Sequence, residues 1–197
     1  MEIAKLWWEA KMAQEQAAEA QHTDVDWKKL NFPPGAGLVH IDSNDLKNPE
    51  QKHFLYMNYL SFFFAIVMYG TMSSIHIIQF SRGRATIVDL CVAMLHGIGG
   101  IALAFIILYR AFKGVLLGGG VWLFYKVLEG LFIFVNFYFM LGSRVKMHGI
   151  SSLFEEAKKP DADMAFIWLA SIEICMVLAG CTLRTINLLE CMYSLDK

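Results

Sequence analysis

One run of 27 residues contains no Asp, Glu, Lys or Arg: FLYMNYLSFFFAIVMYGTMSSIHIIQF, residues 54–80. A helix of this length rises about 40 Å, at about 1.5 Å per residue, and the hydrocarbon core of a bilayer is about 30 Å thick. An amphipathic helix of a soluble protein would carry a charged stripe, and this run carries none. Residues 54–80 therefore predict a membrane-spanning helix.

Three further apolar runs follow, at residues 87–109, 115–141 and 164–189. Each exceeds the roughly 20 residues that a spanning helix needs. The whole chain is 56% hydrophobic and 18% charged, whereas ordinary soluble domains are roughly 45–50% apolar and 25% charged. The sequence predicts an all-α polytopic membrane protein with four transmembrane helices. Connections are expected between the four runs, at residues 81–84, at residues 110–114 with the glycines at 118–120, and at residues 143–163.

Residues 1–52 differ in charge from the remaining chain. They carry nine acids and six Lys, a net charge of −3, whereas residues 53–197 carry +2. We therefore expect an extramembrane N-terminal helix and tail in residues 1–52 and a transmembrane domain in residues 53–197. The overall formal charge of −1 provides no basic field, so a nucleic-acid partner is not expected.

Residues 2–20 are predicted to form an amphipathic helix whose apolar positions, Leu6 and Trp7 among them, follow the helical period. The polar face of this helix is as acidic as it is basic, which favours a partner protein over the membrane surface as the contact of the apolar face. Leu6 and Trp7 are the expected docking residues. Pro33 keeps Phe32 out of the helical conformation, so an extended or turned segment is expected there.

The chain has no phosphate-binding loop, H-E-x-x-H, C-x-x-C or G-x-S-x-G motif, and we expect no enzymatic activity. Small residues instead recur at four-residue spacing in the second run and after it, a pattern that lets membrane helices pack closely. We assign packing roles, in preference to ligand binding, to Ala93, Gly97, Gly100, Ala104, Gly114 and Gly118.

Three charged side chains lie well inside the predicted spans: Lys126, Glu129 and Glu173. An isolated charge at mid-membrane costs at least about 2.5–3.5 kcal/mol. Lys126 and Glu129 share one helix face and are predicted to pair, with a helix–helix or subunit contact, or a proton or ion path, as alternatives. Glu173 has no opposite charge within one turn. It is expected to be protonated, exposed to water or paired, with Lys126, His96 or a residue of another protein as candidate partners.

His76 and His96 lie on the first two predicted spans and are the candidate cofactor ligands, because neighbouring helices can present two imidazoles to a haem iron. Counted from their shared connection, the two side chains are offset by roughly 7–8 Å along the helix axis. Two histidines that bind one haem iron should lie at similar depth, so this offset disfavours a haem site. Hydrogen-bonded histidines in the core of the bundle are the alternative. Neither a cofactor nor a metal is expected, whereas bound lipids are.

The order of features resembles the secretory carrier membrane protein family over roughly residues 30–190. The likeness rests on Asn31-Phe32-Pro33-Pro34, Ser43-Asn44-Asp45-Leu46, Gln51-Lys52, Tyr59-Leu60, Val88-Asp89, Tyr109-Arg110 and Gly149-Ile150-Ser151-Ser152. The resemblance implies four spans and a role in vesicle trafficking, with a Golgi or endosomal location.

The sequence supports three functional hypotheses. The first is a non-catalytic accessory subunit of a large membrane complex, such as a mitochondrial respiratory-chain or ATP synthase assembly, with other membrane subunits and lipids as partners. It is favoured by the absence of catalytic motifs and by an acidic tail that we expect neighbouring proteins to hold, and it places the chain in the mitochondrial inner membrane. The second is the vesicle-trafficking protein. The third is a haem- or proton-linked transport subunit that uses Glu129, Glu173 or His96.

Overall fold

The computed structural model of the chain describes residues 2–21, 25–141 and 149–194. Its elements are α1 (Glu2–Gln21), the 3-10 turn η1 (Ser43–Asp45), α2 (Pro49–Ser81), α3 (Ile87–Leu117), α4 (Gly119–Leu141), α5 (Ile150–Ala157) and α6 (Met164–Ser194). In the described ranges, β-structure is limited to one isolated bridge between Phe32 and Val39. α2, α3, α4 and α6 are long and apolar enough to cross a membrane. The predicted all-α architecture with four apolar spans is confirmed.

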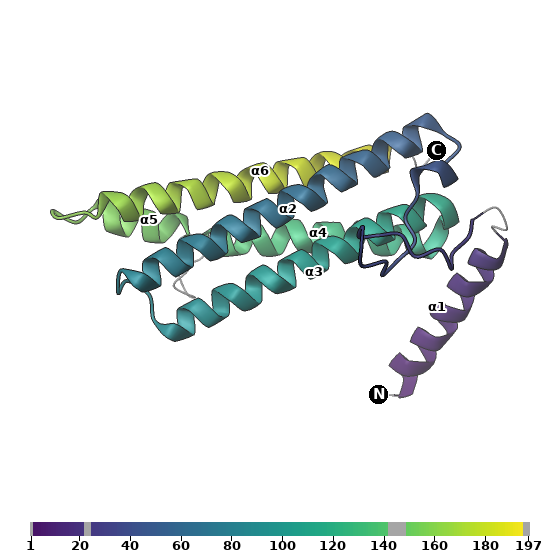
Figure 1. Ribbon diagram of the computed structural model, residues 1–197, viewed down its shortest axis with the longest axis horizontal. Helices are drawn as coiled ribbons and strands as arrows, with labels where there is room; N and C mark the ends of the chain where they lie inside the picture. The colour runs from purple at the N-terminus through teal and green to yellow at the C-terminus, as the bar shows by residue number, and fades with distance from the viewer. Residues whose placement is uncertain (1, 22–24, 142–148, 195–197) are drawn as a thin grey trace.

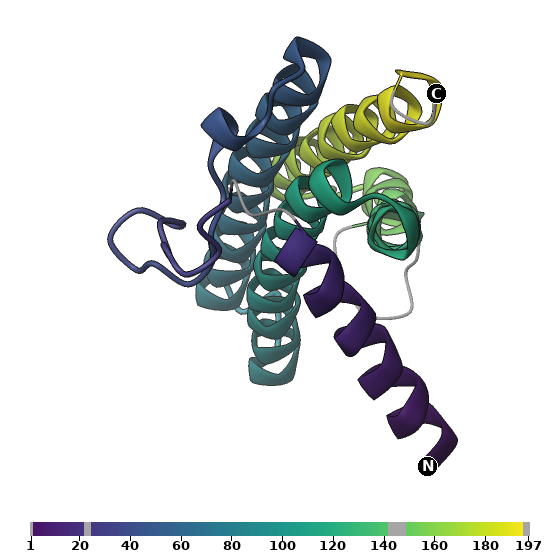
Figure 2. The same cartoon turned by 90° about the vertical axis from the view of Figure 1, so that its right-hand side faces the viewer.

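The four spanning helices form an antiparallel bundle (Figure 1). α2 packs on α3 and α6, and α4 packs on the same two helices, so the four surround a common interior. We call the end with Pro49, Ser194 and the α3–α4 turn the terminal end, and the end with Ser81 and Met164 the loop end. α1 leaves the terminal end at a steep angle to the bundle, as Figures 1 and 2 show from two directions.

Three spanning helices extend beyond their predicted limits, and one of them is α6, which continues past residue 189 to Ser194. α2 begins at Pro49 rather than near residue 54, because Asn48 Oδ1 accepts a hydrogen bond from the Glu50 N–H at 2.9 Å and proline fits the first helical turn. α3 continues through the predicted connection at 110–114 to Leu117. The charged residues that suggested a connection there lie on the helix and form ion pairs with α1, described below.

The turn between α3 and α4 lies at Gly118, and α4 begins at Gly119 rather than at residue 115. These two glycines have φ angles of 64° and 52°, a left-handed region that costs glycine little. Gly118 is therefore a turn residue, and no atom lies within 4 Å of the place a Cβ would take. The predicted loop at 143–163 contains the helix α5, whereas its residues 142–148 lie outside the described residues.

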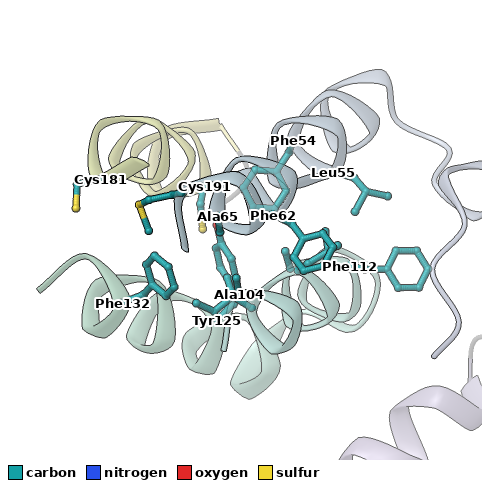
Figure 3. Packing of buried hydrophobic residues seen from close by; sticks show 14 of the residues in the cluster. Phe54, Leu55, Phe62, Ala65, Ala104, Phe112, Tyr125, Phe132, Cys181 and Cys191 are labelled. Carbon is teal, nitrogen blue, oxygen red and sulfur yellow. The ribbon is translucent and has the colours of Figure 1, made fainter. Parts of the chain in front are cut away.

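Apolar side chains fill the interior of the bundle and also cover its outside. In Figure 3, Phe54 of α2 and Tyr125 of α4 lie between the helices, with their rings edge to face and 5.6 Å between centroids. On the outside, Leu95, Ile98 and Phe134 are 70%, 68% and 67% exposed. Such a surface would drive aggregation in water, and lipid chains are its natural contact.

The segment before α2 packs on the bundle through Phe32. The Phe32 ring stacks on Phe105 of α3 at 6.0 Å and lies edge-on to Tyr59 and Phe62 of α2, at 5.3 and 5.9 Å between centroids. Phe32 is buried as a result. One aromatic anchor therefore attaches this part of the tail to the chain's own helices, and the contact of the tail with neighbouring proteins stays a prediction.

Ion pairs close the bundle at the loop end. The guanidinium groups of Arg82 and Arg84, in the α2–α3 turn, lie 2.9 and 3.1 Å from Asp163, just before α6. Arg84 also donates to Glu156 of α5 at 3.2 Å. A hydrogen bond from Lys159, followed by one from the Asp163 N–H, holds the pKa of Glu156 below its ordinary value. These contacts fix α5 and the start of α6 to the α2–α3 turn.

Candidate functional site

A line of polar side chains runs through the bundle interior, and we call it the polar seam. Its members recur at helical spacing on the inward face of each helix, and all except the half-buried His96 are less than a tenth exposed. They are Asn58, Ser61, Tyr69, His76 and Gln79 of α2, His96 of α3, Tyr125, Glu129 and Asn136 of α4, and Glu173, Arg184 and Asn187 of α6.

An ion pair between α4 and α6 lies within the polar seam. Arg184 Nη1 donates to Glu129 Oε2 at 2.6 Å, and both side chains are at most 3% exposed. The Arg184 guanidinium also lies over the Phe132 ring, 4.1 Å from its centroid, a favourable cation–π position. Lys126, the residue predicted to pair with Glu129, is half-buried, and its ammonium lies 5.9 Å from the Trp122 ring centroid. Glu129 is therefore bound by a residue of another helix, which local spacing did not indicate.

Neutral hydrogen bonds link α2 to its neighbours on either side of that ion pair. The Tyr69 hydroxyl donates to Asn136 Oδ1 of α4 at 2.9 Å. The Tyr125 hydroxyl donates to Asn58 Oδ1 at 3.2 Å, and Asn187 of α6 donates to a serine hydroxyl of α2 at 2.7 Å. Each bond satisfies polar atoms that lipid and apolar side chains cannot satisfy, so together they fix the register of the helices.

Glu173, His76 and His96 come together nearer the loop end, from three different helices. His76 Nε2 lies 3.8 Å from Glu173 Oε1, and both side chains are at most 5% exposed. His96 lies against Tyr69 and Phe139, 5.4 and 4.5 Å between ring centroids. His96 and Glu173 also line one cavity of about 10 Å³. Glu173 therefore has His96 nearby, as expected, and also has His76, which was not among its candidate partners.

The surroundings of the two histidines do not fit a haem. The cavity beside His96 has a volume of about 10 Å³, the room of roughly one water molecule. Among the residues that the structure describes, no group of three or more His, Cys, Asp or Glu side chains could hold a metal ion. Lys126, the other candidate partner of Glu173, lies toward the terminal end of α4, away from this cluster.

Glycines of α3 give α2 room to approach. A Cβ added to Gly100 would lie 2.2 Å from Cζ of Tyr69, and one added to Gly97 would lie 2.8 Å from Oγ of Ser73. Since real Cβ atoms do not come so close to other heavy atoms, both positions require glycine while these neighbours stay in place. The Tyr69 ring thereby reaches across α3 toward Asn136.

The remaining small residues of the predicted packing pattern also lie at helix contacts. Ala93 and Ala104 are 4% and 0% exposed on the α2-facing side of α3. Gly114 lies under the Trp122 ring of α4, where a Cβ would be 2.4 Å from Cε3. Close packing of α3 against both neighbours therefore uses all the predicted residues except Gly118.

α1 contacts the bundle through acids, and we call the contact the α1 clasp: Glu15 and Glu19 with Arg110 and Lys113 of α3. Glu15 accepts hydrogen bonds from Arg110 Nη1 at 2.8 Å and from Lys113 Nζ at 2.7 Å, and Lys113 also pairs with Glu19. Glu15 is 5% exposed, whereas Leu6 is 64% exposed. The side chain of Trp7, the other predicted docking residue, lies outside the described residues.

Acidification is expected to release α1 from α3. Burial raises the pKa of Glu15, but hydrogen bonds from Lys113 and Arg110 outweigh it, so the folded pKa lies below the ordinary 4.5. The clasp therefore contributes stability above the unfolded pKa and loses it as pH falls through the lower folded value. The distance between spin labels on α1 and α3 of the nanodisc-embedded chain should lengthen over this acid range. Glu15→Gln should lengthen it at neutral pH.

The exposed Glu9 of α1 provides the control for this measurement. It forms an i,i+4 pair with Lys5 at 3.8 Å, and both side chains are more than half exposed. Glu9→Gln should leave both the label distance and its pH dependence unchanged. A wild-type label distance that stays constant down to acid pH would contradict the role of Glu15.

Comparison of the chain with protein-family models, with curated proteins and with solved structures gives no match.

Proposed function

We propose that the protein is a non-catalytic integral membrane subunit of a larger membrane assembly, which acts by packing against other membrane proteins and lipids. The observation that carries this proposal is the closed interior of the bundle, where Arg184 pairs with Glu129 and Tyr69 bonds to Asn136. The cavity beside His96 is about 10 Å³, whereas small-molecule sites measure roughly 300–1,000 Å³. An interior of this kind supports a scaffold better than it supports substrate turnover.

The apolar face of α1 is the surface that we assign to a protein partner. Leu6 is 64% exposed and lies on the side of α1 opposite Glu15, which anchors the helix to the bundle. Because the α1 clasp sets the position of this helix, the apolar face is presented beside the terminal end of the bundle. The outer bundle surface is assigned to lipids and to neighbouring spans.

Leu6→Glu is expected to weaken the association of the chain with its assembly. Burying a leucine contributes roughly 1.5–3 kcal/mol, so its loss corresponds to roughly ten- to hundredfold weaker association. The measurement is the native size of the tagged full-length chain, solubilised in mild detergent from its own cells. The variant should shift from the size of the assembly toward that of the single chain.

Gln16→Glu provides the matched control, since it adds the same charge at an exposed position of α1 away from the apolar face. Its native size should equal that of the wild type. A wild-type chain that migrates as a single copy in mild detergent would contradict the subunit proposal. Concentration of that single copy in Golgi or endosomal vesicles would favour the trafficking role instead.

A further inference from the structure

One segment of the tail carries no charged side chain: residues 30–39, LNFPPGAGLV. An antiparallel bridge between Phe32 and Val39 closes it into a hairpin, and we call this segment the tail hairpin. It projects sideways from α2 and α3 when the bundle is viewed from its terminal end (Figure 2). The tail hairpin therefore points away from the bundle axis, in the plane that a membrane around the four spans would occupy.

The depth of the tail hairpin follows from its contacts with two spans. The Phe32 ring packs on Phe62 of α2 and on Phe105 of α3. Phe62 lies eight residues after the start of the uncharged run at residue 54, or about 12 Å along the helix. Phe105 precedes Arg110 of the α1 clasp by five residues, or about 8 Å. The base of the hairpin therefore lies beside apolar parts of both spans, inward of the charged residues at the terminal end.

The backbone of the tail hairpin satisfies nearly all of its own donors, which a segment surrounded by lipid must do. Its two prolines carry no N–H, and six other N–H groups donate, in pairs, to three carbonyls of the hairpin. Asn31 and Phe32 donate to the Val39 carbonyl, Leu38 and Val39 to the Phe32 carbonyl, and Ala36 and Gly37 to the Pro33 carbonyl. In residues 31–39, all of them described by the structure, only the Gly35 N–H at the turn is left over. The one polar side chain, Asn31, accepts a hydrogen bond from the Ile41 N–H at 2.8 Å.

The tail hairpin extends the apolar outer surface of the bundle. Leu30 and Leu38 are 54% and 63% exposed. On α2, next to the residues that hold the Phe32 ring, Leu60 and Phe63 are 54% and 55% exposed, and such a surface on a spanning helix faces lipid. Because the hairpin is uncharged and adjoins this surface, lipid suits its outer side better than water does.

We propose that the tail hairpin is inserted into the lipid leaflet at the terminal end, at the boundary between headgroups and acyl chains, with Leu30 and Leu38 against lipid. Lys28 and Lys29 precede the hairpin and are exposed, and cations at that position meet the phosphates of the headgroups. Interfacial segments are embedded about 5–10 Å deep, in agreement with the depth of the aromatic anchor. Residues 30–39, expected outside the membrane with the rest of the tail, then form a membrane contact in addition to the four spans. The insertion needs no partner protein and lies outside the subunit role proposed above.

The test uses the purified full-length chain in lipid nanodiscs, where no partner protein is present. An environment-sensitive fluorescent amino acid replaces Leu38, and its quenching is measured with lipids brominated along the acyl chain and with iodide in the water. We expect the strongest quenching from bromine near the glycerol end of the acyl chain, and several-fold less from iodide than at a water-exposed position. Quenching by iodide without quenching by brominated lipid would overturn the insertion and would leave Leu38 free for a protein partner. Stronger quenching by bromine at the end of the acyl chain would overturn the interfacial depth.

Two other positions provide matched controls for the same probe. Glu50, in the first turn of α2, is exposed, and its probe should be quenched by iodide but not by brominated lipid. Leu95, on the outside of α3, is 70% exposed, and its probe should be quenched by brominated lipid alone. A probe at Leu30 repeats the measurement at a second site of the hairpin. If the Leu30 probe behaves like the probe at Glu50, the insertion is overturned as well.

Discussion

Arg184→Met is expected to lower the free energy of unfolding of the membrane-embedded chain by about 3–5 kcal/mol, the usual cost of removing one partner of a buried ion pair. Methionine is similar in length to the arginine stem and keeps the packing on Phe132. The loss of stability therefore measures the cost of leaving the Glu129 carboxylate without its counter-charge. That carboxylate is 0% exposed and lies 2.6 Å from Arg184. The measurement is equilibrium unfolding in mixed micelles, followed by circular dichroism.

A double-mutant cycle separates the charge from the packing. Glu129→Gln alone should also destabilise the bundle, because it leaves the guanidinium unbalanced. The double variant, Arg184→Met with Glu129→Gln, should recover much of the loss, since no buried charge remains. If the loss of unfolding free energy in the double variant equals the sum of the losses in the two single variants, the two side chains are not coupled.

Gly100→Ala is expected to destabilise the contact between α2 and α3 by about 1–3 kcal/mol, the usual cost of overpacking a filled interior. The new Cβ would lie 2.2 Å from Cζ of Tyr69, so the ring must move, and its hydrogen bond to Asn136 moves with it. The free energy of unfolding measures the loss. The fluorescence of Tyr69 in a variant with the other tyrosines removed reports the displacement of the ring.

The neighbouring Gly99 provides the control for this substitution. It lies on the same helix, and no atom lies within 4 Å of the place its Cβ would take. Gly99→Ala should be neutral or stabilising by up to about 1 kcal/mol, because alanine has the higher helix propensity. An equal loss in both variants would show that helix packing at Gly100 is not the cause.

The four spans could be predicted because their signal is simple. A run such as 54–80 without a charge excludes a solvated helix whatever its neighbours are. The helix limits were harder to predict, because they depend on distant residues. Arg110 and Lys113 follow an apolar run, and two charged residues at that position suggest a loop. They lie on α3 instead, where Glu15 of α1 pairs with both.

The ion pair between Glu129 and Arg184 likewise depends on residues that are far apart in the sequence. Lys126 is the only base within one turn of Glu129, so a local argument selects it. The observed partner lies at the same depth, since Glu129 follows the start of α4 by the same number of residues as Arg184 precedes the end of α6. In antiparallel helices, such positions lie at the same level. The predicted limits at residues 115 and 189 did not show this, because both helix ends differ from the prediction.

The contact face of α1 was assigned from apolar periodicity alone, which indicated Leu6. That assignment concerned a partner protein and stays a prediction. α1 contacts the bundle itself through Glu15, because Arg110 and Lys113 of α3 need a counter-charge there. His76 as a neighbour of Glu173 likewise required the pairing of α2 with α6. Hydrophobic patterns therefore located the helices, whereas the choice of polar partners needed the arrangement of the whole bundle.

The ion pair between α4 and α6 also sets an order of events during biosynthesis. Arg184 follows Glu129 by 55 residues, an interval of roughly 3–11 s at about 5–20 residues per second of translation. Until α6 emerges, α4 carries a mid-membrane acid that lipid cannot accommodate. The nascent α3–α4 hairpin is therefore expected to remain at the insertion machinery until α6 arrives. The ribosome thus delivers the residue that neutralises Glu129 only with the fourth spanning helix.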